Sequence, residues 1–519
     1  MITESPDESF RFKIIGAPGQ EVLELFVEDS SVSKIVNRLQ NSSDLNLDPE
    51  DNLILTSETQ ISKNIKNYHS AFLKTWNNWR LYKSNNCIRT KNEHCYRLSY
   101  AFKANYNLKL LDIILNESAN NLKFCKQSAY VTTVSANEIK ACLPFVEKYR
   151  VKNAENAETA ELPAIIFNGT AKKLSEIKYA IEIANQGKVN MIMNIDSIFD
   201  YQRIRSCLKE TTFTDLDQTI KLLIRYNPKI PQLNNIHPYV ATAIENSKFG
   251  VEEETCVEIL RMAKNDGVRI SGFHMHLGST IKEPEVYSKA LEAINRLICD
   301  ARWKFDEPLI DLKDLVLNIG GGLGLDYQRW LENYDAKNKQ CSAYDLVSTT
   351  VENPKFMQMV HDHNMKIILE PGRSLIGNAS ILLAKILGKK TNITKTKNFL
   401  ITDISMSECI RPALYNAYHH IQAIETPAYN SNSKSELYDV VGPVCESGDF
   451  IGKNVKIFDQ SVEKNKIIAL FDVGAYCGVM GSNYNLRLRP AEFLVKKDGS
   501  VEIIAEREDL SAVLDRFAI

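Results

Sequence analysis

The chain has 519 residues, a formal net charge of −2 and an apolar content of 44%. This length exceeds what one small core supports and predicts two domains, and the near-neutral charge gives no reason to expect nucleic acid or an anionic membrane as a partner. No apolar run reaches the roughly 20 residues of a membrane-spanning helix, and the acidic N-terminus lacks the apolar region of a secretory signal, so we expect a cytoplasmic protein.

The first 96 residues contain two strand-like pieces, 10–18 and 53–58. We expect part of this N-terminal segment, residues 1–96, to join a β domain formed elsewhere in the chain. The stretches 76–97 and 148–162 are polar and irregular, which predicts surface insertions.

Between residues 97 and 375, short β-like runs alternate with amphipathic stretches that have helical spacing. The predicted strands are 96–102, 129–134, 164–167, 189–195, 221–226, 269–276, 315–320 and 366–370. Strands that alternate with helices in this number are typical of a parallel (β/α)₈ barrel. After residue 376 the sequence is rich in β-like runs and turn signals, so residues 376–519 predict a second, mostly β domain of sandwich-like or barrel-like type.

A lysine, Lys103, directly follows the first predicted barrel strand. The active sites of such barrels form at the C-terminal ends of the strands. A buried ammonium group is costly unless it is paired or neutralised. Lys103 therefore either reaches solvent, which is the commoner case, or forms a Schiff base with an aldehyde.

Three consecutive glycines, Gly320, Gly321 and Gly322, follow the seventh predicted strand. Such a run lets backbone N–H groups approach an anion closely, although many glycine-rich turns are only tight turns. Ser279 and Arg373, at neighbouring strand ends, strengthen the case for phosphate, which is often bound at the late strands of a barrel.

An acidic residue, Glu370, ends the eighth predicted strand and could instead form an ion pair with Arg373. A phosphate site, a lysine and an acidic group together fit pyridoxal phosphate, whose ring nitrogen must stay protonated. His276 is expected to stack on the cofactor ring. His274 and His276 share a strand face, but no carboxylate in their motif completes a metal site, and the 11 cysteines form no C-x-x-C pair, so we predict no metal.

In the second domain, Cys445 and Glu446 lie in the glycine-flanked segment "VGPVCESGDF". A lone cysteine is usually a small apolar residue. A polar, glycine-flanked loop should make this one accessible, which leaves a role in proton transfer open.

A series of segments in fixed order resembles one family, the fold-type III pyridoxal-phosphate decarboxylases, and within it most closely the diaminopimelate decarboxylases. The resemblance covers residues 97–519. It is carried by "YAFKANYNLKLL", "IIFNGTAKK", "HPYVATAIENSKFG", "GFHMHLGST", "LNIGGGLGLDY", "ILEPGRSLIGN", "IRPALYNAYHHI", "VVGPVCESGDFIGK" and "GAYCGVMGSNYNLRLRPAEFLV".

The resemblance implies decarboxylation of meso-2,6-diaminopimelate to L-lysine and CO₂, with pyridoxal phosphate held on Lys103. It further implies a homodimer whose active sites are shared, with Cys445 and Glu446 supplied by the other subunit. The implied catalytic residues are Lys103, Cys445, His276 and Glu370; the cofactor-binding residues are Lys103, His276, Ser279, Gly320, Gly321, Gly322, Glu370, Gly372, Arg373 and Tyr476; the substrate-binding residues are Arg373, Arg411, Tyr415, Glu446 and Tyr476. For delivery of a proton to the substrate carbon we favour Cys445, with Lys103 second.

Three alternatives stay open. The chain could decarboxylate another substrate, such as ornithine, lysine, arginine or a D-amino acid, on the same fold. It could be a cofactor-free regulatory relative, although such a protein would tolerate loss of Lys103 and the phosphate groups. It could be a racemase of the same barrel type, which places a less acidic group than Glu370 at the ring nitrogen.

Overall fold

The structure is a computed structural model of the chain. It describes residues 9–16, 21–42, 47, 51–84, 96–120, 128–149, 162–211, 219–231, 242–281, 283–331, 342–351, 354–394, 396–427, 434–458, 461–462 and 467–517. The chain divides into two compact units: the barrel unit, Asn64–Gly324 with Gln340–Ser374, and the β unit, Met1–Lys63 with Leu325–Lys339 and Leu375–Ile519.

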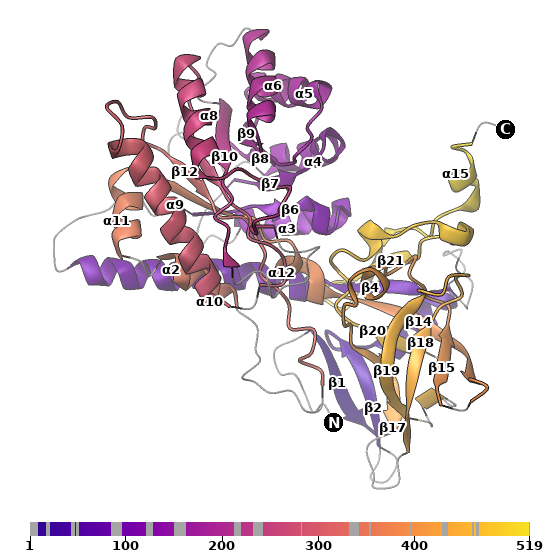
Figure 1. Ribbon diagram of the computed structural model, residues 1–519. Coiled ribbons are helices and arrows are strands. Elements are labelled where there is room, and N and C mark those ends of the chain that lie inside the picture. The colour runs from indigo at the N-terminus through magenta and orange to yellow at the C-terminus, as the bar shows by residue number, and fades with distance from the viewer. Residues whose placement is uncertain are drawn as a thin grey trace. The chain divides into compact units, whose positions relative to one another are not determined.

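The barrel unit is built on one parallel sheet (Figure 1). Its strands are β5 (Tyr96–Leu98), β6 (Tyr100–Ala101), β7 (Tyr130–Thr133), β8 (Ala164–Phe167), β9 (Asn190–Ile195), β10 (Ile220–Arg225), β11 (Gly272–His274), β12 (Val316–Asn318) and β13 (Lys366–Leu369). The strand order β5-β13-β12-β11-β10-β9-β8-β7-β6 begins and ends with two segments that are neighbours in sequence.

The barrel closes at Ser99, the single residue between β5 and β6. The backbone N–H of Ser99 donates to the carbonyl of Leu369 at 2.8 Å, and that of Ala101 donates to the carbonyl of Pro371 at 3.0 Å. β5 pairs with β13 while β6 pairs with β7, so residues 96–101 act as one interrupted strand. Counted with β5 and β6 as one strand, the nine strands of this sheet correspond to the eight strands of a barrel. This confirms the predicted (β/α)₈ barrel and the place of each predicted strand.

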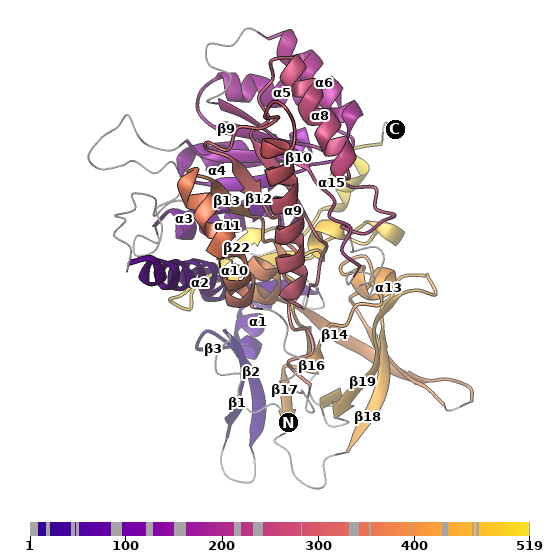
Figure 2. The same ribbon diagram turned by 60° about the vertical axis from the view of Figure 1, so that its left-hand side comes forward.

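Helices separate the barrel strands and cover the sheet (Figure 2). They are α3 (Leu108–Asn120), α4 (Ala136–Lys148), α5 (Leu174–Asn185), α6 (Ile198–Lys209), α8 (Glu253–Asn265), α9 (Glu285–Trp303), α10 (Ala343–Val351) and α11 (Pro354–Asp362). The short helix α12 (Arg373–Ile376) follows the last barrel strand. Serines begin two of the helices that cover the sheet: the side chains of Ser135 and Ser197 accept the N–H of the residue three positions on, as N-caps do.

The prediction of an irregular stretch at 76–97 is wrong for its first part. Helix α2 runs from Glu58 to Ser84 without interruption, because this segment contains no proline or glycine and its first half buries an apolar stripe at helical spacing, Ile61, Ile65, Tyr68 and Phe72. Lys148 ends α4 rather than opening a loop. The remainders of the two predicted insertions, 85–95 and 150–161, lie outside the described residues.

The β unit contains two sheets. One consists of β1 (Phe10–Ile15), β2 (Val22–Val27), β3 (Ser30–Ser31) and β17 (Glu425–Pro427). The other consists of β4 (Leu53–Ser57), β14 (Ser380–Thr391), β15 (Asn398–Thr402), β16 (Ile421–Ala423), β18 (Ser435–Val441), β19 (Phe450–Phe458), β20 (Ile467–Leu470), β21 (Ala491–Val495) and β22 (Val501–Ala505). Helices α1 (Val32–Gln40), α13 (Arg411–Tyr415) and α15 (Leu510–Leu514) complete the unit.

Strand β4 joins the start of the chain to its C-terminal part. It pairs antiparallel with β14 and parallel with β21, and all five of its residues are buried. A strand buried between two partners contributes backbone hydrogen bonds on both edges and side chains on both faces. The second domain is mostly β, as the sequence predicted. Among the described residues, no helix is both long enough and apolar enough to cross a membrane.

Candidate active site

Lys103 lies in a single 3₁₀ turn, Phe102–Ala104, directly after β6. Its neighbours Phe102 and Ala104 are buried, whereas Lys103 itself is exposed. The Tyr100 hydroxyl donates to the carbonyl of Asn105 at 2.8 Å and fixes the exit of the turn. The backbone is thus anchored on both sides while the amine stays accessible, which avoids the cost of a buried ammonium.

Glu370, directly after β13, is a buried carboxylate surrounded by donors. Asn318 Nδ2 donates to it at 2.8 Å, Thr132 Oγ1 at 3.1 Å, and Asn168 Nδ2 lies 3.4 Å from both of its oxygens. His274 Nε2 lies 3.3 Å from Oε2. Thr132, His274 and Asn318 lie on β7, β11 and β12, and Asn168 directly follows β8, so strand ends from different parts of the barrel converge on one carboxylate.

Glu370 is ionised at neutral pH. Burial alone raises the pKa of its carboxyl group, but the interaction with His274, the hydrogen bond from Asn318 and the proximity of His276 outweigh it and lower the pKa to about 2. Burial lowers the pKa of His274, so this ring is neutral. Its Nε2 must then carry the proton that faces the carboxylate, since the buried Nδ1 has no hydrogen-bond partner.

His276 is a neutral ring with a defined tautomer. Desolvation, followed by the charges of Lys103 and Arg225, lowers its pKa well below the usual value. The backbone N–H of Gly321 donates to His276 Nδ1 at 3.2 Å, so Nε2 carries the proton. The Thr242 hydroxyl donates to the His276 carbonyl at 2.6 Å and anchors the backbone.

The glycine run is packed against the two neighbouring strand ends. A Cβ at Gly320, Gly321 or Gly322 would lie 2.2 to 2.4 Å from a backbone oxygen, of Met275, Glu370 and Gly278 respectively. Gly320 and Gly322 have φ values of 70° and 112°, which favour glycine. The tight-turn interpretation therefore holds at all three positions.

Only part of this run keeps free donors for an anion. The N–H of Gly320 donates to Asn318 Oδ1 at 2.9 Å and that of Gly321 to His276. Among the described residues, none accepts the N–H of Gly322. Nearby, Arg373 Nη2 lies 3.1 Å from Ser279 Oγ, so the predicted serine and arginine are together, and Gly372 stands between β13 and α12.

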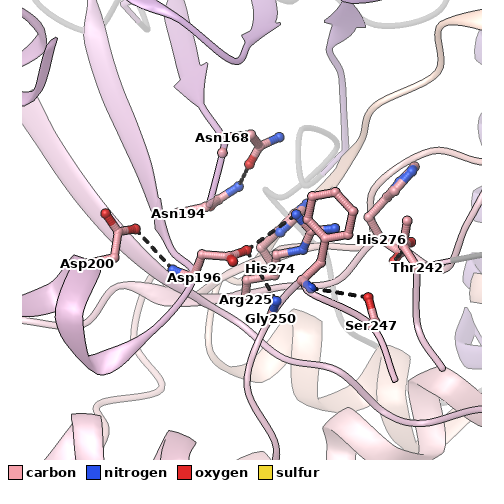
Figure 3. Close-up of polar contacts among 12 residues, drawn as sticks. Asn168, Asn194, Asp196, Asp200, Arg225, Thr242, Ser247, Gly250, His274 and His276 are labelled. Atoms are coloured by element: carbon pink, nitrogen blue, oxygen red, sulfur yellow. Dashed lines mark hydrogen bonds and ion pairs between the residues drawn. The ribbon is translucent and has the colours of Figure 1, made fainter. Parts of the chain in front are cut away.

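A buried polar network extends from these strand ends across β8, β9 and β10 (Figure 3). Asn194 donates to Asn168, and Arg225 Nη1 lies 3.4 Å from Asp196 Oδ1. Asp196 also accepts the N–H of Gly250 at 3.2 Å. Gly250 has a φ of 73°, and a Cβ there would lie 2.9 Å from the Arg225 carbonyl. The segment "NSKFG" is thus a loop held against β10.

In the β unit, Arg411 begins helix α13 and is 4% exposed. Its Nη1 lies 2.7 Å from His419 Nε2 and 3.1 Å from the Tyr327 hydroxyl. Its Nε is buried without a hydrogen-bond partner. No carboxylate among the described residues forms an ion pair with this guanidinium, although a buried charge normally has one. Tyr415, at the other end of α13, is partly exposed.

The loop with Cys445 and Glu446 is tied to the segment that precedes Arg411. Asp449 accepts the N–H of Met406 at 2.7 Å and that of Val444 at 3.0 Å. The N–H of Cys445 donates to Asn485 Oδ1 at 2.8 Å. Cys445 and Glu446 are both exposed, which agrees with the accessible loop that the sequence predicted.

Tyr476 has a left-handed backbone, with φ of 59°. This conformation is unfavourable for a bulky residue and often marks a functional position. The next residue, Cys477, has its Sγ 3.4 Å from that of Cys409. The structure thus brings the loops carrying Arg411, Cys445 and Tyr476 together within the β unit.

Cys409, Cys477 and His419 also form a buried group whose ligand atoms lie within 4.8 Å of one another. Such a set could bind zinc. However, His419 Nδ1 lies 2.8 Å from the Phe471 carbonyl and Nε2 faces Arg411. The one lone pair of the His419 ring, on Nε2, therefore already faces Arg411. A metal ion bound to that nitrogen would lie beside the positively charged guanidinium.

The comparisons with known proteins agree with one another. The family described as "Pyridoxal-dependent decarboxylase, pyridoxal binding domain" matches residues 84–377. A rice protein, "Probable diaminopimelate decarboxylase, chloroplastic", is 32% identical over 424 residues, 81% of this chain and 74% of its own. The diaminopimelate decarboxylase of Aquifex aeolicus is 36% identical over 362 residues, 69% of this chain and 77% of its own. The chain belongs to the diaminopimelate decarboxylase family.

A solved structure supports the same family assignment over nearly the whole chain. The diaminopimelate decarboxylase of Methanocaldococcus jannaschii, in complex with L-lysine, has a TM-score of 0.73 and 25% identity, and the match covers 98% of each chain. The resemblance seen in the sequence is thereby confirmed. The protein is a pyridoxal-phosphate-dependent carboxy-lyase.

The residues of the barrel unit fit the cofactor of this family. Lys103 offers an accessible amine, and Glu370 offers an ionised carboxylate for a protonated ring nitrogen. The Gly322 N–H, Ser279 and Arg373 offer donors for a phosphate. The glycine turn leaves no room for side chains, which keeps the backbone close to any group bound there.

Sequence reasoning missed the residues that hold the site in place. Glu370 is held by hydrogen bonds from Thr132, Asn168, Asn318 and His274. Arg411 is held by Tyr327 and His419. For the first four, the available signal was a polar side chain at or beside the end of an otherwise apolar strand, as in "IIFNG" and "VLNIG". Tyr327 and His419 gave no such signal.

Proposed function

We propose that this chain decarboxylates meso-2,6-diaminopimelate to L-lysine and CO₂. The observation that carries the proposal is Arg411: a buried cation whose Nε has no partner and whose side chain faces no described carboxylate. A carboxylate at the unreacting end of the substrate supplies the missing anion, in the bidentate arrangement that arginine favours. Amines without that carboxylate leave the guanidinium unmatched and bind poorly.

The barrel residues hold the reacting end. When bound, pyridoxal phosphate supplies the electron sink that accepts the electrons of the breaking carbon–carbon bond. Lys103 carries the cofactor's aldehyde before substrate arrives. Glu370 keeps the proton on the ring nitrogen, and the neutral ring of His276 stacks on the cofactor. Ser279, Arg373 and, in the turn Gly320–Gly322, the N–H of Gly322 bind the phosphate, together with Tyr476 of the β unit.

The residues of the β unit hold the other end. Arg411 and Tyr415, with Arg373 of the barrel unit, bind the carboxylate, and Glu446 binds the ammonium group beside it. Cys445, an exposed thiol on an anchored loop, donates the proton that replaces CO₂, with Lys103 as the second candidate. We further propose a homodimer in which Cys445 and Glu446 complete the partner's site, and a cytoplasmic location.

The first experiment measures the absorbance of the purified protein and quantifies lysine and CO₂ after addition of meso-diaminopimelate. We expect a band near the visible edge that shifts with substrate, and lysine release. Lys103→Ala removes both, whereas Lys109→Ala, on the surface of α3, keeps both. A band without lysine release transfers the substrate assignment to another basic amino acid. A colourless protein that takes up no cofactor contradicts the proposal.

The shared site is tested by mixing two inactive variants, Lys103→Ala and Cys445→Ala. If Cys445 acts on the partner's Lys103, half of the randomly mixed dimers contain one intact site of two, so activity returns to about a quarter of the native value. Cys299→Ala is a matched control for cysteine removal. No recovery in a mixture that demonstrably exchanges subunits overturns the shared site.

A further inference from the structure

Within the described part of the chain, the Arg411 guanidinium forms hydrogen bonds through one nitrogen, Nη1. Nη1 carries two hydrogens, and two acceptors lie within reach: His419 Nε2 at 2.7 Å and the Tyr327 hydroxyl at 3.1 Å. The Tyr327 ring also lies under the guanidinium, 4.9 Å from centroid to Cζ. Bidentate binding of a carboxylate needs two parallel N–H donors. With Nη1 engaged, the remaining donor pair is Nε with Nη2.

The Nε–Nη2 edge is the one left open. Nε is buried and has no hydrogen-bond partner, and among the described residues none hydrogen-bonds Nη2. A buried donor without a partner costs stability. The arrangement therefore keeps one planar pair of donors ready for an anion with two oxygens.

His419 fixes this arrangement because its own protonation is determined by the backbone. Nδ1 lies 2.8 Å from the Phe471 carbonyl, which can only accept, so Nδ1 carries the proton. With that hydrogen on Nδ1, Nε2 presents its lone pair towards Arg411, and the Cys477 thiol also hydrogen-bonds the His419 side chain. The Tyr327 ring meets the His419 ring edge-on, with centroids 5.2 Å apart and planes at 71°, which restricts rotation of both.

We propose that His419 is a positioning residue for substrate specificity: anchored on the Phe471 carbonyl, it accepts a hydrogen bond from Arg411 and directs the Nε–Nη2 edge of the guanidinium at the substrate carboxylate. This inference rests on the proposed function. It adds that recognition of the carboxylate depends on a residue that itself touches neither substrate nor cofactor.

Two variants separate the two bonds of the His419 ring. In His419→Gln, the amide oxygen reaches the position of Nε2 and still accepts from Arg411. In His419→Asn, the amide nitrogen lies near the position of Nδ1 and keeps the bond to Phe471, while the acceptor for Arg411 is lost. His420→Gln is the matched control, because His420 bonds Gln422 and stacks near Trp330 without contacting Arg411.

The readout compares two ligands of the holoenzyme that differ by one carboxylate. L-lysine and 1,5-diaminopentane are titrated by their effect on cofactor absorbance, and the ratio of their Kd values measures the carboxylate contact. We expect His419→Asn to reduce this ratio about tenfold, the size expected for losing a hydrogen bond to a charged group. His419→Gln and His420→Gln should keep it within about threefold, and 1,5-diaminopentane should bind all variants alike.

Steady-state kinetics give an independent check. His419→Asn should raise the KM for meso-diaminopimelate about as much as it weakens lysine binding, with a smaller change in kcat. If both His419 variants fail to fold, Tyr327→Phe removes the other acceptor of Nη1 while keeping the ring, and a reduced ratio is expected there too.

The possible failures are distinguishable. If the unmodified enzyme binds lysine no better than 1,5-diaminopentane, the proposed function fails together with the role of Arg411. If it discriminates clearly and His419→Asn discriminates equally well, only the role of His419 is overturned. If His419→Asn weakens the binding of lysine and of 1,5-diaminopentane equally, the variant is generally damaged and the role of His419 is overturned. Stoichiometric zinc bound to Cys409, Cys477 and His419 also overturns that role.

Discussion

The two units treat a buried charge in opposite ways. In the barrel unit, the Glu370 carboxylate is surrounded by donors from Asn318, Thr132, Asn168 and His274. In the β unit, the Arg411 guanidinium donates to His419 and Tyr327 and interacts with the Cys477 thiol, but none of the described residues supplies it with a carboxylate and its Nε has no hydrogen-bond partner there.

This difference in hydrogen bonding distinguishes a preorganised catalytic group, Glu370, from a ligand-binding group, Arg411. Glu370 has its hydrogen bonds in place before any ligand arrives, so its charge is fixed and available to hold a proton on a cofactor nitrogen. Arg411 has no carboxylate partner among the described residues, so a ligand carboxylate can take that place. We therefore expect loss of Glu370 to lower the rate and loss of Arg411 to weaken binding.

The largest effect is expected from Glu370→Gln. The variant cannot hold the ring nitrogen as a full cation, so kcat should fall by roughly 10²- to 10³-fold while cofactor still binds. The protein should fold, because His274 has a second, unpaired nitrogen and can change tautomer to suit the amide. Single-turnover CO₂ release measures the rate of decarboxylation, and the absorbance of the cofactor measures its binding. An unchanged kcat contradicts the assigned role.

Arg411→Met should act on binding instead. We expect KM for meso-diaminopimelate to rise roughly 10²-fold, because a site built around a polar contact loses that contact, with the cofactor band unchanged. The free energy of unfolding should change by less than about 1 kcal/mol, because no buried carboxylate is left without its partner. Strong destabilisation would show that Arg411 serves a structural role. Arg11→Met, on strand β1 in the other sheet of the β unit, where the arginine pairs with the exposed Asp29, is a suitable control.

The pH dependence of stability should single out Glu370. Its pKa is lowered from 4.5 to about 2, so its contribution to the free energy of unfolding is fully present above about pH 5 and is lost as the pH falls towards 2. The difference in thermal stability between the native protein and Glu370→Gln, measured without cofactor, should therefore shrink across this range. A constant difference contradicts the lowered pKa.

The smallest effect is expected from Thr132→Val, which removes one of several donors to Glu370 and conserves shape. The remaining donors limit the loss to about 1 kcal/mol, and kcat should fall only a few-fold. Asn318, with the shorter contact of 2.8 Å against 3.1 Å for Thr132, should matter more. Urea unfolding of Thr132→Val and Asn318→Leu ranks the two, and the reverse order would contradict the geometry.

Much of the barrel could be predicted from the sequence because its signals are local. Strands that are buried on both faces appear as apolar runs, and the residues at their ends, such as Lys103, His276 and Glu370, are brought to one end of the barrel by topology alone. The closure at Ser99 could not be predicted, because it depends on hydrogen bonds between residues 270 positions apart in sequence. The polar composition of residues 76–84 suggests a loop, but the absence of proline and glycine lets the helix that begins at Glu58 continue through them.

The sequence by itself determined the chemistry: which residues carry an amine, a carboxylate, a thiol and an unhindered backbone, and in which order. Only the tertiary structure decided how each charge is supported. Asn168 and Asn318 are 150 residues apart yet share one carboxylate, and Tyr327 and His419 reach Arg411 from separate segments. Hydrogen bonds act over about 3 Å of space whatever the distance along the chain, so no local pattern could reveal these partners.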